Sequence, residues 1–162
     1  MAVIRNKKPG KVVVAVSGGF DPIHPGHVRL FKHARSLGDR LVVILNNDNW
    51  LMKKKNFVFM GEKQRKEVLE GIRYVDEVII SKHPRNPSDM SVCRELSGLK
   101  PHVFANGGDR NRKDANKSSS SLNPEQLLCK KLGIAMAFNV GKGGKIESSS
   151  WLLQKFLRSR SL

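Results

Sequence analysis

The feature that most limits the possible folds is a regular alternation of short apolar runs with longer amphipathic stretches. Five runs rich in apolar and β-branched residues are each about as long as one buried strand. The first amphipathic stretch, Pro25–Leu37, places Leu30, Phe31 and Ala34 on one helical face, begins with a proline and is followed by Gly38. Such alternation predicts successive strand and helix units.

We predict strands at Lys11–Val16, Leu41–Asn46, Glu77–Ile80, His102–Ala105 and Ile134–Asn139. We predict helices at Pro25–Leu37, Glu62–Ile72, Ser88–Leu96, Pro124–Leu132 and Ser149–Leu157. This order indicates an α/β fold, a Rossmann-like doubly wound sheet of about five parallel strands with helices on both faces. The length of 162 residues predicts one domain spanning residues 1–162.

Ligands of such sheets bind beyond the carboxyl ends of the strands, so the loops that follow the strands are the predicted site. The four loops to inspect are Ser17–Pro25, Asn47–Met60, Asn106–Asn123 and Gly141–Ser148. Within the third, residues 111–121 read NRKDANKSSSS, which is polar, low in complexity and without periodicity. We predict a mobile insertion there.

The net charge of +16, from 30 basic and 14 acidic residues, predicts polyanionic partners. Nucleic acid, an anionic membrane surface and small polyphosphates all fit, and charge alone does not choose among them. The longest apolar runs, Val12–Val16 and Leu41–Leu45, are too short to span a bilayer, and the N-terminus lacks a secretory pattern. Because the two cysteines form no CxxC pair, we expect reduced thiols and a cytoplasmic protein.

The strongest chemical signal is SGGFDPIHPGH, residues 17–27, at the turn from the first strand into the first helix. Its glycines let a ligand approach the backbone, and a helix N-terminus binds anions. His24 and His27 would then lie at the helix mouth, where imidazoles can stabilise charge that develops on a phosphate. The alternative is a pair of capping or core histidines. Neither GxGxxG nor GxxxxGK[ST] is present, so dinucleotide and P-loop sites are not supported.

HPGH preceded by GGFDPI resembles the signature of the HxGH nucleotidyltransferase superfamily, the cytidylyltransferase-like enzymes that include glycerol-3-phosphate cytidylyltransferase and heptose-phosphate adenylyltransferase. The resemblance covers nearly the whole chain, since later segments follow in the family's order: NNDNWLMKKK at 46–55, EKQRKEVLEGIRYVDEVI at 62–79, NGGDR at 106–110 and KIESSSWLL at 145–153. Cytidylyltransferases carry an arginine shortly before the last of these segments, where this chain has only Lys142 and Lys145 nearby.

The resemblance implies a role for each matching residue. The catalytic residues would be His24, His27 and Lys55. The nucleotide would be bound by Gly18, Gly19, Phe20, Asp21, Gly26, Asp109, Ser148, Ser149 and Ser150, with Asp21 also a ligand of Mg²⁺. The phosphorylated acceptor would be bound by Asp48, Lys53, Lys54 and Arg65.

The function implied is transfer of a nucleoside monophosphate from CTP or ATP to a phosphorylated sugar or polyol, such as glycerol 3-phosphate or a heptose phosphate, with release of pyrophosphate. The expected cofactor is Mg²⁺ carried with the triphosphate. We expect a homodimer, no membrane association and only non-specific nucleic-acid binding. Two alternatives remain: an adenylyltransferase acting on a vitamin-derived phosphate (FMN, nicotinate mononucleotide or phosphopantetheine), and a basic nucleic-acid-binding module.

Overall fold

The computed structural model describes residues 11–108, 110–120, 122–141 and 148–161. In these ranges the strands are β1 (Val13–Gly18), β2 (Arg40–Leu45), β3 (Glu77–Ile80), β4 (Val103–Gly107) and β5 (Ala135–Val140). The helices are α1 (Pro25–Arg35), α2 (Asp48–Lys55), α3 (Glu62–Glu70), α4 (Cys93–Leu99), α5 (Arg112–Ala115), α6 (Leu122–Leu132) and α7 (Ser149–Ser159).

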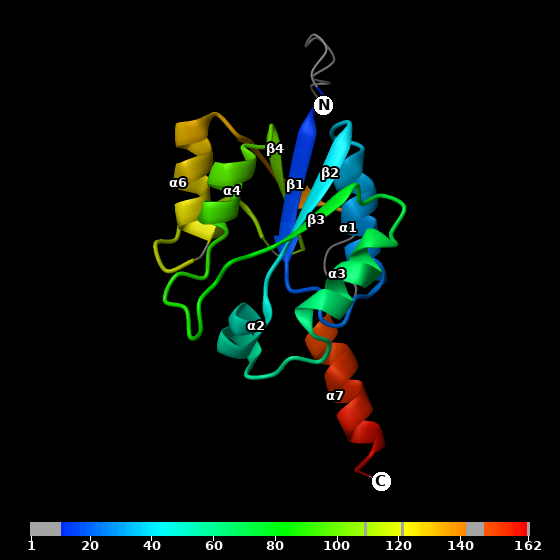
Figure 1. The fold of residues 1–162 in the computed structure, drawn as a ribbon. Helices are drawn as coiled ribbons and strands as arrows, with labels where there is room; N and C mark the ends of the chain where they lie inside the picture. The colour runs from blue at the N-terminus through cyan, green and yellow to red at the C-terminus, as the bar shows by residue number, and fades with distance from the viewer. Residues whose placement is uncertain (1–10, 109, 121, 142–147, 162) are drawn as a thin grey trace.

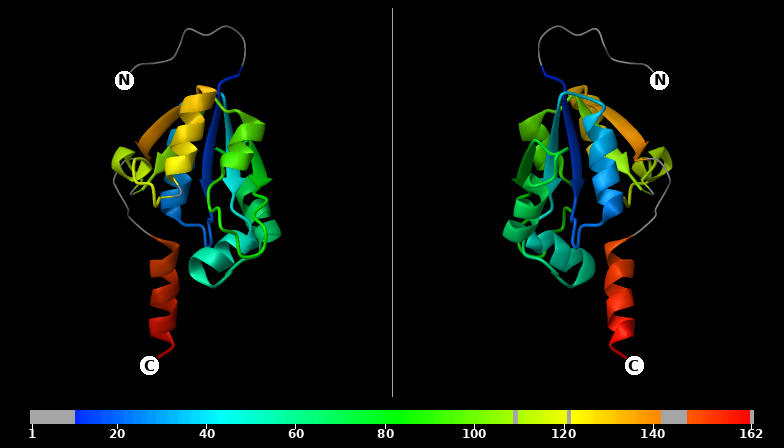
Figure 2. Two further views of the ribbon diagram at one scale, coloured as in Figure 1. Left: turned by 90° about the vertical axis from the view of Figure 1, so that its left-hand side faces the viewer. Right: turned by 90° about the vertical axis from the view of Figure 1, so that its right-hand side faces the viewer.

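The five strands form one parallel sheet in the order β3-β2-β1-β4-β5. Helices α1 and α3 cover one face and α4 and α6 the other (Figure 1). The chain reverses its direction of strand addition between β1 and β4, and in open α/β sheets ligands bind at the carboxyl ends of strands at such a switch point. Helices α2 and α7 lie at this end of the sheet, and α7 extends away from the body (Figures 1 and 2).

Two apolar clusters bury the two faces of the sheet. Because successive strand residues point to opposite faces, Val14 and Val16 pack into the cluster around Phe31, whereas Ala15 packs with Phe104. Burial on both faces explains why the strand sequences are continuous apolar runs and do not alternate with polar residues. The predicted fold class, an α/β doubly wound parallel sheet, is confirmed.

The strands and five main helices were predicted in the correct order, but the interpretation of Asn47–Met60 as a loop is wrong. Its first half is helix α2, which buries only Trp50 and Leu51 and ends in three lysines. So few apolar positions produce no visible helical periodicity. The Asn47 side chain caps this helix by accepting a hydrogen bond from the Trp50 N–H.

Part of the predicted mobile insertion at residues 111–121 is ordered secondary structure. Arg112–Ala115 forms α5, and Ala115 is fully buried in the second apolar cluster. Mobility of the remainder stays a prediction. Cys129 is buried and Cys93 half-buried, both as free thiols. Among the described helices, none is both long and apolar enough to cross a bilayer.

Candidate active site

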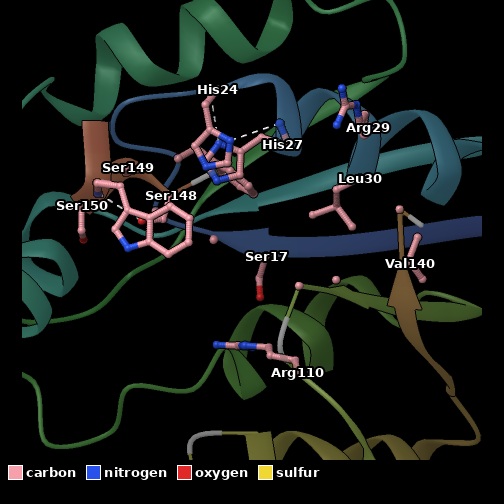
Figure 3. Close-up of a pocket in the computed structure, with 18 of the residues that line it drawn as sticks. Ser17, His24, His27, Arg29, Leu30, Arg110, Val140, Ser148, Ser149 and Ser150 are labelled. Atoms are coloured by element: carbon pink, nitrogen blue, oxygen red, sulfur yellow. Dashed lines mark hydrogen bonds between the residues drawn. The ribbon is translucent and has the colours of Figure 1, made fainter. Parts of the chain in front are cut away.

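A cavity of about 450 Å³ opens at the carboxyl ends of β1 and β4, between the N-termini of α1 and α7 (Figure 3). Its walls come from five segments of the chain that are distant in sequence. They contribute Ser17, Gly18, Gly19, Phe20, His24, Gly26, His27, Arg29 and Leu30 from the end of β1 into α1; Lys55 of α2; Gly107, Gly108 and Arg110 from the end of β4 onward; Val140 and Gly141 at the end of β5; and Ser148, Ser149, Ser150 and Trp151 at the start of α7.

The two histidines form the N-terminal cap of α1. The Gly26 N–H donates to His24 Nδ1 at 3.1 Å, and the His24 backbone N–H donates to His27 Nδ1 at 3.3 Å. These bonds satisfy N–H groups that have no partner within the helix. The two side chains that cap the helix are thus the same ones that line the cavity. The capping and catalytic interpretations of the motif are therefore compatible.

The capping bonds also fix the tautomer of both neutral imidazoles. Each Nδ1 accepts a hydrogen bond, so the proton of each neutral ring is on Nε2. The two rings stack with centroids 3.6 Å apart, and both line the cavity. The motif thus presents a pair of imidazole N–H donors at a helix N-terminus, which suits an anionic ligand.

The residues between and beneath the histidines are fixed by close packing. A Cβ at Gly26 would lie 2.8 Å from the His24 ring, so a side chain there would displace the imidazole. Phe20 packs edge-on against His27 at 4.9 Å and against Phe31 at 5.1 Å. It does so with φ of 48°, a left-handed conformation that costs a phenylalanine about 1–2 kcal/mol. The core thus holds a strained residue beneath His27.

A second helix N-terminus faces the cavity from α7. Ser148 is its N-cap, with a side chain that accepts from the Trp151 N–H at 3.1 Å. The Ser149 hydroxyl donates to the Pro22 carbonyl at 2.7 Å, which attaches the start of α7 to the loop before α1. The dipoles of α1 and α7 therefore both place positive ends beside the cavity (Figure 3).

Cations reinforce this positive field. Arg29, Lys55 and Arg110 line the cavity, and among its described lining residues there is no carboxylate. The field acts on His27, whose pKa is lowered from 6.5 to about 3 by burial first, then by His24 and Lys55. His27 is thus a neutral hydrogen-bond donor at physiological pH.

The three lysines of α2 point in three directions, because successive helical residues are about 100° apart. Lys55 lines the cavity with the histidines. Lys54 lines a second hollow beside it, and Lys53 lies in a third, where its Nζ donates to Asn86 Oδ1 at 2.8 Å. The structure therefore places Lys53 and Lys54, both predicted to bind the acceptor, in different hollows from each other and from Lys55.

Arg65 and Asp48, both expected at the acceptor, lie outside the cavity lining. Arg65 is 1% exposed and donates to the carbonyls of Met60, Gly19 and Asn46 and to the Asp48 carboxylate, at 2.7–2.8 Å. With Nε, Nη1 and Nη2 all bonded inside the protein, we reassign Arg65 from ligand binding to holding these loops together. Asp48 is its charged partner.

Asp21, the expected Mg²⁺ ligand, also makes internal bonds. It is 2% exposed, and its two carboxylate oxygens accept the N–H groups of Phe59 and Met60 at 2.7 and 2.8 Å. We therefore reassign Asp21 to fixing the loop that precedes α3. Asp109, the other expected carboxylate near the nucleotide, lies outside the described residues, as do Lys142 and Lys145.

The cavity side chains that were not predicted as site residues include two cations, Arg29 and Arg110, and the aromatic Trp151. Arg110 follows the NGGD run after β4, and Trp151 directly follows the serine cluster, so both lie within or beside loops marked as the site. Arg29 is exposed on α1, two residues after His27, and only helical geometry turns it toward the ligand side.

The chain matches the family described as cytidylyltransferase-like over residues 15–130, more than half of its length. It is 43% identical over 101 residues to the FAD synthase of Pyrococcus horikoshii, covering 62% of this chain and 65% of that protein. It is also 43% identical over 70 residues to the glycerol-3-phosphate cytidylyltransferase of Bacillus subtilis, covering 43% of this chain and 54% of that one. The chain thus spans less than two thirds of either relative.

Among solved structures, the lipopolysaccharide core biosynthesis protein of Thermoplasma volcanium has the same fold. The TM-score is 0.59 at 23% identity, covering 80% of this chain and 95% of that one.

The buried position of Arg65 predicts a large effect on stability. Arg65→Met removes the donors of three carbonyl groups and leaves Asp48 without its partner, so the free energy of unfolding should fall by about 3 kcal/mol or more. Urea unfolding measures this. Lys66→Met is the matched control, because Lys66 forms an exposed pair with Glu70 and its loss should cost less than about 0.5 kcal/mol. Equal stability of both variants would restore Arg65 as a candidate ligand-binding residue.

The lowered pKa of His27 predicts a stability that depends on pH. Between pH 6.5 and about 3 the unfolded chain binds a proton at His27 that the folded chain does not. The free energy of unfolding should therefore fall as the pH drops through this range, by up to about 1.4 kcal/mol per unit. Unfolding curves at several pH values should show that His27→Gln loses this contribution while His33→Gln keeps it. Parallel curves for parent and His27→Gln would contradict the assignment.

Proposed function

Because the chain belongs to the cytidylyltransferase-like family, we propose that it is a nucleotidyltransferase that transfers a nucleoside monophosphate from CTP or ATP to a phosphorylated small molecule. The observation that carries the proposal is the stacked pair of imidazole N–H donors between two helix N-termini in one cavity. Such preorganised donors stabilise charge developing on a transferred phosphoryl group.

In the proposed reaction an oxygen of the acceptor's phosphate attacks the α-phosphorus of the triphosphate. The bond between the α-phosphorus and the bridging oxygen breaks in line, and pyrophosphate leaves with the bond's electron pair. Catalysis of this kind requires positioning and charge neutralisation and needs no covalent enzyme intermediate. His24 and the neutral His27 would donate to the α-phosphate, and Lys55 would neutralise charge beside them.

The N-terminal turn of α7 would bind the remaining phosphates. Ser148 and Ser150 offer hydroxyls and the helix offers backbone N–H groups at its positive end. Trp151, which is 44% exposed at the cavity rim, is placed where an aromatic ring can stack on a nucleobase. Gly18 and Gly19, after β1, leave the cavity floor open to the ligand.

Mg²⁺ belongs to the proposal as a companion of the triphosphate. No group of three or more His, Cys, Asp or Glu side chains that could hold a metal exists in the part of the chain that the structure describes. Asp21, with both oxygens bonded internally, does not fit a ligand role. The ion would therefore be held mainly by phosphate oxygens, where it would neutralise charge on the leaving pyrophosphate.

We place a phosphorylated sugar or polyol first as acceptor. The glycerol-3-phosphate cytidylyltransferase of Bacillus subtilis supports it through 43% identity. FMN is the competing candidate, and similarity favours it, because the FAD synthase of Pyrococcus horikoshii is equally similar over a longer stretch. Pyrophosphate release from CTP and ATP with glycerol 3-phosphate, heptose phosphates and FMN decides between them. A homodimer and weak, non-specific nucleic-acid binding complete the proposal.

The first prediction of the proposal concerns the histidines. His27→Ala, and His24→Asn, which keeps an N-capping side chain but removes the imidazole, should each lower turnover by about two orders of magnitude or more. Pyrophosphate-release kinetics measure the loss, and thermal melts check the fold. His33→Ala, on the same helix but outside the cavity, should retain parental turnover. Turnover within about threefold of the parent in both cavity variants would refute the mechanism.

The second prediction separates the lysines of α2. Lys55→Met removes the cation that lines the cavity, so kcat/KM should fall by roughly two orders of magnitude. Lys53→Met removes an exposed cation bonded to Asn86 and should change kcat/KM by less than about threefold. Steady-state kinetics of the two variants test this difference. If both variants match the parent, Lys55 takes no part in phosphate binding.

A further inference from the structure

A second hollow of about 560 Å³ lies beside the cavity, and Arg110 lines both. Lys54 lines it from α2, Asp89 from the loop before α4, and Ser118–Ser120 from the segment before α6. Figure 3 shows Arg110 on the opposite side of the cavity from His24 and His27. Arg110 is therefore the described side chain common to the two spaces.

Arg110 is paired with a carboxylate from the protein interior. Its Nη1 lies 3.8 Å from Oε2 of Glu125, a residue of α6 that is 2% exposed. Glu125 Oε1 accepts the Val92 N–H at 3.0 Å, whereas Oε2 has no hydrogen-bond partner among the described residues. Burial raises the pKa of Glu125, and the Arg110 charge opposes that rise.

A buried carboxylate with an oxygen that lacks a hydrogen bond lowers the stability of the fold. We therefore expect Glu125 to serve a function that outweighs this loss. At 3.8 Å the pair attracts through charge without engaging the guanidinium in a hydrogen bond. The guanidinium is thus oriented by Glu125 while its donors stay available. A guanidinium carries five donors in one plane and can bind two oxyanions at once, which an ammonium does less well.

We propose that Arg110 binds the acceptor's phosphate in the second hollow together with the α-phosphate in the cavity, and that Glu125 is the residue that positions Arg110. The inference rests on the proposed nucleotidyl transfer. Two anions must approach each other in that reaction, and a cation shared between them offsets their repulsion.

The second hollow favours a hydroxylated acceptor. Lys54 and Arg110 supply charge for its phosphate. Asp89 accepts the Ser91 N–H at 2.9 Å, which orients its carboxylate, and this group together with the hydroxyls of Ser118–Ser120 suits sugar or polyol hydroxyls. The hollow is also lined by Trp50, Met90, Leu122 and Pro124, which offer apolar surface to the carbon skeleton of the acceptor. The charged and hydroxyl groups of the hollow therefore suit a phosphorylated polyol or sugar, the acceptor class that we propose for it.

A double-mutant cycle at Arg110 and Glu125 tests the positioning role. With glycerol 3-phosphate as acceptor and saturating triphosphate, Arg110→Met should lower kcat/KM about 100-fold, and Arg110→Lys should recover only part of it. Glu125→Gln keeps the shape and an acceptor for Val92, and should lower kcat/KM about 10-fold. The double variant should be no worse than Arg110→Met. Arg112→Met, a neighbouring cation outside both hollows, should stay within about twofold.

Additive effects in the cycle would overturn the positioning role, since Glu125 would then act independently of Arg110. An unchanged KM for glycerol 3-phosphate in Arg110→Met and Lys54→Met would overturn the acceptor site.

Calorimetric titration of glycerol 3-phosphate with a non-hydrolysable CTP analogue present needs no turnover. If no acceptor yields pyrophosphate but Arg110→Met still weakens this binding, the proposed function fails and the site stands. If glycerol 3-phosphate does not bind at all, or only FMN reacts, the site assignment fails.

Discussion

The buried guanidinium of Arg65 is the interaction on which the candidate active site depends. From α3 it bonds the carbonyls that follow β1 and β2, the carbonyl of Met60 and the carboxylate of Asp48 in α2. Asp21 adds a second attachment, because its carboxylate holds the backbone of Phe59 and Met60. The loop that carries the histidines and the helix that carries Lys55 are thereby held to a common frame. Internal ion pairs of this kind are expensive, and here they define geometry.

Each histidine ring also has two uses, because one of its nitrogens caps the helix and the opposite nitrogen is left for ligand binding. Backbone N–H groups of α1 occupy Nδ1, which leaves Nε2 as the donor toward the cavity. Burial and neighbouring positive charge keep His27 neutral, so its donor strength is unchanged between mildly acidic and alkaline pH. Helix formation alone would therefore orient these donors before any ligand arrives, which is the condition for preorganised stabilisation.

Sequence patterns predicted the sheet and the histidine loop because both have short-range causes. Burial of both sheet faces requires continuous apolar strands, and the turn from β1 into α1 requires glycines and a cap in consecutive positions. Helix α2 escaped detection because Trp50 and Leu51 alone bury it. The roles of Arg65 and Asp21 also escaped, since a charged residue near a phosphate site and one that holds a loop look alike in sequence. Only their partners, up to 46 positions away, separate the two uses.

The two hollows at the carboxyl ends of the strands differ in their distribution of charge. The cavity with the histidines derives its positive field from two helix dipoles and from Arg29 of α1, Lys55 of α2 and Arg110 after β4, and any triphosphate would meet that field. The neighbouring hollow is different, since it mixes Lys54 and Arg110 with a carboxylate and hydroxyls. A uniformly positive surface attracts anions without distinguishing them, whereas alternating charge and hydroxyl groups demand a matching ligand. If the proposed transfer is correct, selectivity for the acceptor would reside in the hollow whose chemistry is mixed, and the net charge of +16 would attract both anions to the same edge of the sheet.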